Sequence, residues 1–565
     1  MSRISWSARR NGWPTAPSAS RYLLSVWSGL ERMRAGDARV INAYLARLGR
    51  FAATLAKSDP AFAQSDEPWP VVNNLGNRLR KFARPLVGVV QALVLVPSML
   101  RQVRKLYRIR NVCGRATMIV GIASNRLPLN SSMSARAELS RLARVLGNAG
   151  NGDIATRMTS RECILLFDAL PRSRFWKCRS KCWQDNVLIV DGVFLLALFV
   201  LALCTRPRET LRTYLRYVAD GSASDIDRPP GSARRLVCAF IATAYGEALH
   251  GLSISEGVFF NSNSTLTELL RAYLIHLEEC GPIYDIMHGV GSVEAERFFT
   301  GLLAEGQKCG ALERYVFVPQ VPNLPLHGAF QRQAIGGGVA INSYLNNYFI
   351  DREEGPTQTV EAFVEAEYRL ICPGPRRARN PLIVTLFGTY EDGRSFFESS
   401  AFKAECLLLS LINQCKLRAS IDAMTLYVPH PKHSSAELSH PIFAATGAKL
   451  YRHSVFCWLV SDLCVSLFSS AMFEAVYFGA RGFTPLTAAD DLYTPYLNLV
   501  SHPKSDSWED LVSELRRVVV HCEQAPRLDV MERARRRLAL MGCDGMFRPE
   551  DSAVGASQAA GWRVG

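Results

Sequence analysis

The sequence lacks the features that mark several large classes of protein. Its first residues, Met1 to Trp13, contain no apolar core of the kind that a secretory signal peptide carries. No repeat of fixed period and no long low-complexity tract is evident in the 565 residues. These absences argue against a secreted protein, a repeat solenoid and a disordered chain, and they predict a cytoplasmic protein.

The cysteines form neither a disulfide framework nor a metal site. There are 15, an odd number, scattered through apolar segments, as is typical of reduced and buried thiols. The closest pair, Cys178 and Cys182, has no second Cys or His pair at zinc-finger spacing. We therefore expect no metal ion and no cofactor.

An uninterrupted apolar run long enough for a simple membrane span is also lacking. Residues 85–100 are uncharged, but they fall short of the roughly twenty residues that a span needs, and basic residues on both sides conflict with the positive-inside bias. An element lying on an anionic membrane fits this segment better. Residues 187–204 are apolar apart from Asp191, so a buried strand or helix explains them at least as well as a span.

What the chain has in excess is positive charge. It carries 66 Lys and Arg against 51 Asp and Glu, a net charge of +15, which favours a polyanionic partner or an anionic membrane surface. A nucleic-acid partner ranks third, because no aromatic platforms for base stacking are evident. Residues 21–57 place apolar residues at helical spacing between arginines, so this segment either lies on a membrane or docks against another helix.

Polar residues follow a predicted strand at residues 425–428. His430, Pro431 and Lys432 come directly after it. Open α/β folds bind ligands at the carboxyl ends of parallel strands, so these three residues are candidates to hold an anionic ligand above a sheet.

A second apolar run, residues 459–468, predicts a buried strand that leads into a helix at Ser469 and Ser470. The first N–H groups of a helix have no partner within it and suit a diphosphate. Glu474 lies four residues after Ser470, on the same face of the helix, where its carboxylate can accept from ribose hydroxyls. An ordinary serine-capped helix with an exposed glutamate fits the same residues equally well.

A companion βα unit is predicted just upstream. Residues 381–387 form a strand and residues 395–415 a long amphipathic helix. The loop between them has neither the G-x-G-x-x-G nor the Walker pattern. Its candidate ligand contacts are Gly388, Thr389 and Arg394, of which the arginine can reach a phosphate.

The same alternation occurs earlier, where helices at 234–250 and 264–280 alternate with strands at 253–260 and 282–287. The last strand ends in His288 and Gly289. A histidine in this position can act as a general base or bind an acceptor, and it can equally be satisfied by local hydrogen bonds.

Taken in order, these motifs resemble those of GT-B glycosyltransferases, especially the bacterial surface- and capsular-polysaccharide type and its relatives that transfer glycerol phosphate. The matching residues are Asp285 to Gly289, His430-Pro431, and Ser469-Ser470 with Glu474-Ala475. The resemblance covers about residues 234–487. It implies that the second domain binds a nucleotide-sugar, that acceptor chemistry occurs between the domains, and that His288 is the base.

The expected fold class is therefore α/β, with two Rossmann-like domains (GT-B) facing a cleft and an additional, mainly helical N-terminal region. We expect a basic, membrane-associated region at 1–115, an acceptor domain at 116–350, a nucleotide-sugar domain at 351–500, and closing helices with a tail at 501–565. The helix expected at 528–541 places Arg533, Arg535, Arg536 and Arg537 on a solvated face.

The expected activity is transfer of a sugar from a nucleotide-activated donor to a surface glycan or lipid-linked acceptor, at the inner face of a membrane. Two alternatives remain open. One is a non-catalytic, membrane-associated scaffold of GT-B-like shape, and the other is a glycerophosphotransferase-type polymerase.

Overall fold

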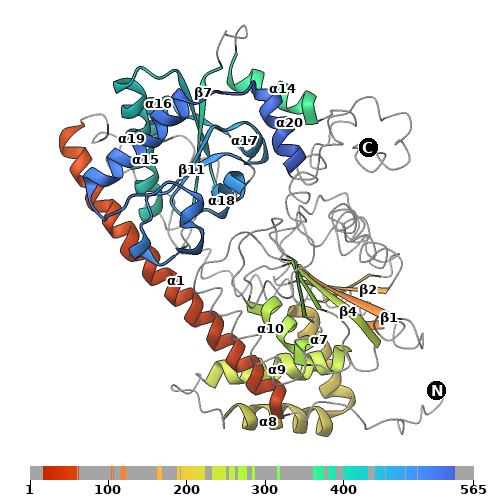
Figure 1. Cartoon of the computed structure of the whole chain (residues 1–565). Coiled ribbons are helices and arrows are strands. Elements are labelled where there is room, and N and C mark those ends of the chain that lie inside the picture. Colours follow the sequence, from red (N-terminus) through yellow and green to blue (C-terminus); the bar gives the residue numbers. More distant parts are fainter. Residues whose placement is uncertain are drawn as a thin grey trace, which may run out of the picture.

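The computed structural model contains two parallel α/β sheets and a long N-terminal helix (Figure 1). The fold class predicted from the sequence is confirmed by these elements. The structure describes residues 17–59, 62, 103–104, 106, 116–122, 162–167, 187–190, 192–222, 232–249, 253–260, 265–276, 283–286, 315–318, 360–373, 380–389, 399–430, 440–451, 454–477, 479–492 and 494–540.

The first sheet has six parallel strands in the order β3-β2-β1-β4-β5-β6. This is the strand order of a doubly wound Rossmann fold, in which the order reverses between the first and fourth strands. Short runs rich in β-branched residues form the outer strands, because such side chains suit a buried pleated surface. The strands are β1 Ala116–Ile122, β2 Glu162–Phe167, β3 Val187–Val190, β4 Ser253–Phe260, β5 Ile283–Ile286 and β6 Tyr315–Val318.

The second sheet has five parallel strands in the order β11-β10-β7-β8-β9. Counted along the chain, this is the same Rossmann pattern with its reversal between β7 and β10. Every residue of the central strand β7 is buried, as expected for a parallel strand covered on both faces. The strands are β7 Leu382–Phe387, β8 Ala423–Val428, β9 Lys449–Leu450, β10 Leu463–Ser466 and β11 Arg481–Phe483.

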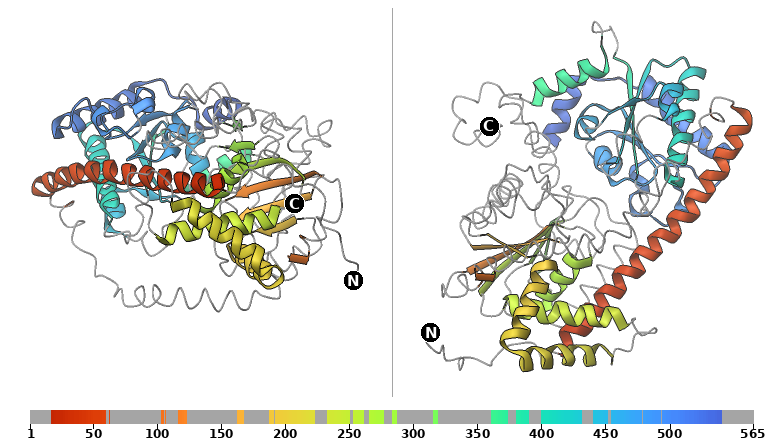
Figure 2. Two further views of the ribbon diagram at one scale, coloured as in Figure 1. Left: turned by 90° about the horizontal axis from the view of Figure 1, so that it is seen from below. Right: turned by 180° about the vertical axis from the view of Figure 1, so that it is seen from behind.

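Helices cover the second sheet on both sides (Figures 1 and 2). The longest of these helices, α15, begins at Ser400, five residues later than the sequence predicted. Ser399 caps it by accepting a hydrogen bond from the Phe402 backbone N–H at 3.3 Å. The helices are α14 Val360–Ile371, α15 Ser400–Arg418, α16 Pro441–Thr446, α17 Ser454–Val460, α18 Ser470–Tyr477, α19 Trp508–Gln524 and α20 Val530–Leu540.

Two of the predicted solvated arginines on α20 are buried instead. Arg537 Nη1 donates to the Trp458 carbonyl at 2.8 Å, Arg533 donates to the Val460 carbonyl, and Arg533 pairs with Asp462 at 2.8 Å. The carbonyls at a helix C-terminus have no partner within the helix and attract cations. Arg533 and Arg537 therefore cap the end of α17, and the prediction of a solvated face was wrong for them.

Two apolar runs that the sequence treated as single segments are divided in the structure. The predicted strand at 459–468 is the end of α17 followed by the four-residue strand β10. The candidate span at 187–204 is β3 followed by helix α7, Gly192–Thr205. Apolar periodicity alone does not separate a buried strand from a buried helix, which explains why 459–468 was predicted as one strand. At 187–204 the structure has a strand and a helix, the alternative that the sequence offered to a span. None of the helices in the described part of the chain has the length and apolar character needed to span a membrane.

Helix α1, Pro17–Ser58, runs along the side of both units (Figures 1 and 2). Its first half packs against three helices beneath the first sheet, and its second half packs against α15. Buried leucines lie in both halves, including Leu23, Leu30 and Leu48. The segment is therefore a docking helix, the second of the two alternatives that its pattern left open. The three helices are α8 Pro207–Ser222, α9 Ser232–Leu249 and α10 Thr265–His276.

We predict that Gly482→Ala destabilises the second unit. A Cβ at this position in β11 would lie 2.5 Å from Val476 Cγ2 and 2.6 Å from Val500 Cγ1, so the substitution overpacks the contact. The expected loss is about 1–3 kcal/mol, measured by urea unfolding. Gly49→Ala is the matched control, because its Cβ would meet nothing within 4 Å and the helix should gain up to about 1 kcal/mol. Equal unfolding midpoints for the two variants would contradict the packing described here.

Candidate functional site

The carboxyl edge of the second sheet, at β7 and β10, is the place where a ligand is expected. The chain winds from β7 to β8 and β9 on one side, then returns to β10 and β11 on the other. Open α/β sheets bind ligands outside the carboxyl ends of strands at this kind of reversal. Gly388 and Thr389 follow β7, and Ser469 follows β10, so two of the predicted binding segments flank the reversal.

The loop after β10 is tied both to β7 and to the start of α18. Ser466 Oγ donates to the Phe387 carbonyl at 3.2 Å and accepts from the Ser469 N–H at 2.9 Å. Ser469 then caps α18, since its Oγ accepts from the Ala471 N–H at 3.4 Å and its carbonyl accepts from the Met472 N–H at 3.2 Å. The predicted helix start is therefore confirmed, and the positive end of α18 lies at the reversal.

Ser470 and Glu474 both lie on α18, four residues apart. Their side chains fall outside the described part of the structure, so their roles stay predictions. Gly479, in a left-handed conformation at φ 93°, ends the turn after this helix. The sequence prediction of a helix followed by a short strand, β11, is confirmed here.

The segment after β7 passes very close to the end of β8. The Gly388 N–H donates to the Val428 carbonyl at 2.8 Å. A Cβ at Gly388 would lie 2.8 Å from Tyr427 Oη and 3.2 Å from the His430 backbone nitrogen. A glycine is therefore required at 388, and the close approach brings Gly388, Thr389 and His430 together at one edge of the sheet.

A buried carboxylate, Glu405 on α15, holds this edge together. The backbone N–H and the hydroxyl of Thr389 both donate to Glu405 Oε1 at 2.6 Å. Tyr427 Oη donates to Glu405 Oε2 at 2.6 Å. One side chain thus joins the loop after β7 to strand β8.

Burial makes this carboxyl group an unusual acid. Desolvation raises the pKa of Glu405 from 4.5 to about 7, against the opposing effect of the hydrogen bonds from Thr389 and Tyr427. The sequence analysis missed this residue. The available signal was a lone carboxylate between apolar neighbours one helical turn away on each side, Phe402 and Leu408 among them.

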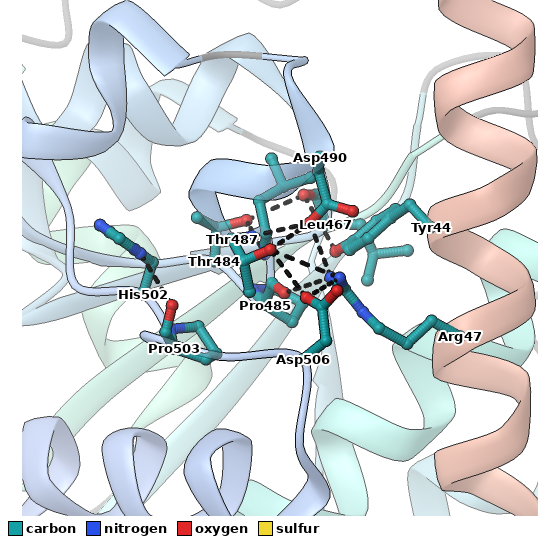
Figure 3. Close-up of polar contacts among 11 residues, drawn as sticks. Tyr44, Arg47, Leu467, Thr484, Pro485, Thr487, Asp490, His502, Pro503 and Asp506 are labelled. Carbon is teal, nitrogen blue, oxygen red and sulfur yellow. Dashed lines mark hydrogen bonds and ion pairs between the residues drawn. The ribbon is translucent and has the colours of Figure 1, made fainter.

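A second polar cluster joins α1 to the neighbouring loops (Figure 3). Arg47 is buried, and its guanidinium contacts Asp490 Oδ2 at 2.7 Å, the Pro485 carbonyl at 3.1 Å, and Asp506. One turn earlier, Tyr44 Oη donates to the Leu467 carbonyl at 3.3 Å. The sequence analysis missed this cluster too, because the partners lie more than four hundred residues further along the chain.

Four of the predicted site residues lie outside the described residues: His288, Arg394, Pro431 and Lys432. His288 follows β5, whose predicted end is confirmed to within one residue. The placement of His288 opposite the serines of α18 stays a prediction. Within the described part of the chain, no group of Asp, Glu, His and Cys has the arrangement of a metal site.

A scan of protein-family models and a search of curated proteins find no match to this chain. Among solved structures, a UDP-GlcNAc 2-epimerase from Neisseria meningitidis bound to UDP-GlcNAc aligns at 10% identity and a TM-score of 0.37, covering 79% of this chain and 99% of that one. The wall teichoic acid polymerase TagF aligns at 12% identity and a TM-score of 0.34, covering 86% and 96%. The glycosyltransferase SnogD from Streptomyces nogalater aligns at 11% identity and a TM-score of 0.34, covering 79% and 99%. The fold assignment comes from the two parallel sheets themselves.

We predict that Glu405→Gln removes a pH-dependent part of the stability. The pKa of Glu405 is higher in the folded protein than in the unfolded chain, so its contribution is fully present below about pH 4.5 and is lost as the pH rises through about 7. Relative to wild type, the variant should gain on the order of 2–3 kcal/mol across that window, at 1.36 kcal/mol per pKa unit.

The measurement is urea unfolding at a series of pH values. Glu532→Gln is the control, because Glu532 lies on α20 in surface ion pairs with Arg535 and Arg536. Wild type and Glu405→Gln curves that stay parallel from pH 4.5 to 7.5 would show that Glu405 does not titrate in this range.

Proposed function

We propose that the protein is a GT-B glycosyltransferase that moves a sugar from a nucleotide-activated donor to a surface glycan or lipid-linked acceptor. The observation that carries the proposal is that three predicted segments follow the neighbouring strands β8, β7 and β10 at the carboxyl edge of the second sheet. These are Gly388-Thr389 after β7, His430 after β8 and the amino end of α18 after β10. The N–H groups of Gly388 and Thr389 already donate to Val428 and Glu405, so the groups proposed to meet an anionic ligand are the His430 imidazole and the helix N-terminus.

In this proposal the second unit binds the nucleotide-sugar. The first turn of α18, with Ser469 and Ser470, holds the diphosphate. There the diphosphate competes with Ser469 Oγ for the Ala471 N–H, whose hydrogen bond to that oxygen is long, at 3.4 Å. Glu474 accepts hydrogen bonds from the ribose hydroxyls. The remaining contacts to the nucleotide-sugar are assigned to Gly388, Thr389, Arg394, His430, Pro431 and Lys432.

The proposed transfer step uses His288 as the base and the second unit as the donor site. His288 removes the proton from an acceptor hydroxyl, and the acceptor oxygen forms a bond to the anomeric carbon of the sugar. The bond from that carbon to the diphosphate breaks, and the nucleoside diphosphate leaves with the electron pair. His430 and Lys432 offset the negative charge that develops on the leaving diphosphate.

Two other functions use the same architecture. A glycerophosphotransferase-type polymerase would bind a nucleotide-activated glycerol phosphate at this edge, and a non-catalytic scaffold would bind no nucleotide. Glu474, one turn into α18, is suited to the ribose of a nucleotide donor, which favours both nucleotide-dependent functions over the scaffold.

Nucleotide binding is expected to raise the melting temperature. A ligand that binds only the folded state stabilises it, by about 2.7 kcal/mol at one hundred times its Kd. The measurement is a thermal shift with UDP, CDP and GDP, their sugars, and CDP-glycerol. A shift with CDP-glycerol alone would favour the polymerase, and no shift with any nucleotide would favour the scaffold.

His430→Ala and Glu474→Ala are each expected to abolish transfer while leaving the melting temperature of the free protein within a few degrees of wild type. Glu532→Ala, on the surface of α20, is the control and should keep full activity. Full transfer by both site variants would remove the donor-site assignment.

We also propose that the exposed face of α8 contacts an anionic membrane. Leu211 and Leu215 lie one turn apart and are 49% and 53% exposed, whereas the buried face of the same helix holds Thr210 and Tyr217. Arginines 208, 212 and 216 are exposed beside the leucines. Leucines in solvent framed by arginines suit the boundary between acyl chains and anionic headgroups.

Vesicle sedimentation is expected to report this contact. Wild type should bind phosphatidylglycerol-containing vesicles more strongly than pure phosphatidylcholine, and the double variant Leu211→Ser, Leu215→Ser should lose most of that binding. Leu417→Ser, at the exposed end of α15, is the matched control. Wild-type binding by the double variant would exclude this face, as would a leucine-dependent dimer in sizing chromatography.

A further inference from the structure

The loop that carries Ser469 is held in place by a helix from the other end of the chain. The Leu467 carbonyl accepts two hydrogen bonds, from Thr484 Oγ1 at 2.9 Å and from Tyr44 Oη at 3.3 Å (Figure 3). The ring of Phe468 meets the ring of Tyr44 edge to face at 6.4 Å. Leu467 and Phe468, the two residues before Ser469, therefore both contact α1.

We infer that Tyr44 and Arg47 are positioning residues that fix the geometry of the nucleotide-binding loop. The inference rests on the proposed function, because it assigns these residues to the loop that would bind the diphosphate. Neither side chain is placed to touch the ligand. Tyr44 acts through the Leu467 carbonyl, and Arg47 acts through the Pro485 carbonyl and the carboxylates of Asp490 and Asp506.

Tyr44 is suited to this role because its hydroxyl is a hydrogen-bond donor. The side chain is buried, and burial raises the pKa of Tyr44 well above its ordinary value, with a further contribution from the nearby Asp490 carboxylate. The hydroxyl therefore keeps its proton well beyond neutral pH, and in the structure it donates to the Leu467 carbonyl. Without it, that carbonyl keeps one of its two donors, from Thr484.

Arg47 holds the adjoining segment after β11. One guanidinium contacts Asp490 and the Pro485 carbonyl within the turn, and Asp506 just before α19. Thr487 joins the same cluster, because its backbone N–H donates to Asp490 Oδ2 at 2.7 Å and its hydroxyl to Asp506 Oδ1 at 2.8 Å. A planar fork of five donors makes these contacts at once, which the single ammonium group of a lysine does not reproduce.

The support for this loop is anchored outside its own unit. The first half of α1 packs on α8, α9 and α10, and Glu31 pairs with Arg234 of α9 at 2.6 Å. Between these anchors, residues 34–43 of the helix include no buried side chain. One continuous helix, α1, therefore connects the first unit to the loop of the second unit that would bind the nucleotide.

Hydrogen exchange of the ligand-free protein tests the positioning role directly. In Tyr44→Phe, amides of residues 467–472 should exchange roughly fivefold faster, the equivalent of one net hydrogen bond. In Arg47→Lys, residues 484–490 should exchange faster as well. Peptides from β7 and α15 should match wild type in both. Arg50→Lys, an exposed arginine one turn further along α1, is the matched control and should change nothing.

Nucleotide titration of the same variants completes the test. Tyr44→Phe should raise the Kd for the nucleotide identified by thermal shift roughly fivefold, and raise KM for the donor more than it lowers kcat. Tyr44→Phe removes a single oxygen atom and is expected to fold. The experiment therefore still tests the inference if Arg47→Lys fails to fold.

The outcomes separate this inference from the proposed function. Unchanged exchange at 467–472 in Tyr44→Phe, or faster exchange spread evenly over the whole second unit, would overturn the positioning role. Local acceleration in the variants, together with a wild-type protein that binds no nucleotide, would uphold the positioning of the loop and overturn the nucleotide assignment.

Discussion

The edge of the second sheet depends on one buried carboxyl group. Glu405 receives three hydrogen bonds of 2.6 Å from two elements, and these fix the loop after β7 against the end of β8. Ser466 extends the same edge to β10 through the Phe387 carbonyl. Burying a carboxyl group is costly unless its hydrogen bonds are satisfied, and these three bonds satisfy Glu405. A pKa of about 7 means that this group is partly protonated near neutral pH, where its bonding pattern changes.

Local sequence patterns were sufficient to predict the βα units. Strand β4 has the predicted bounds, and β7 and α9 differ from theirs by one or two residues, because their apolar runs end at clear polar or glycine signals. The error came at 459–468, which was predicted as one strand but contains the end of α17 and the strand β10, with Ser461 and Asp462 between them. The buried arginines of α20 were beyond local reasoning, since Arg533 contacts a carbonyl 73 residues away in sequence.

The candidate site shows the same division. Gly388, His430 and Ser469 were predicted because they follow strands, and the carboxyl ends of parallel strands share an edge. Which ends are neighbours depends on the strand order, and a single sequence does not contain that order in its local patterns. Glu405 and Arg47 were missed because each acts through partners that only the fold supplies. For Arg47 those partners are more than 430 residues away.

The long helix α1 also bears on the order in which the molecule is assembled. During synthesis the second half of α1 is made long before Asp490 and Asp506. Arg47 and the apolar residues around Leu48 therefore stay without these partners until translation is nearly complete. A fragment beginning near residue 360 would contain all five strands of the second sheet, yet two acidic side chains would lack their cation and α15 would expose an apolar surface. Excising that fragment for study removes part of its core, because the boundary between the two units in space does not correspond to a cut in the chain.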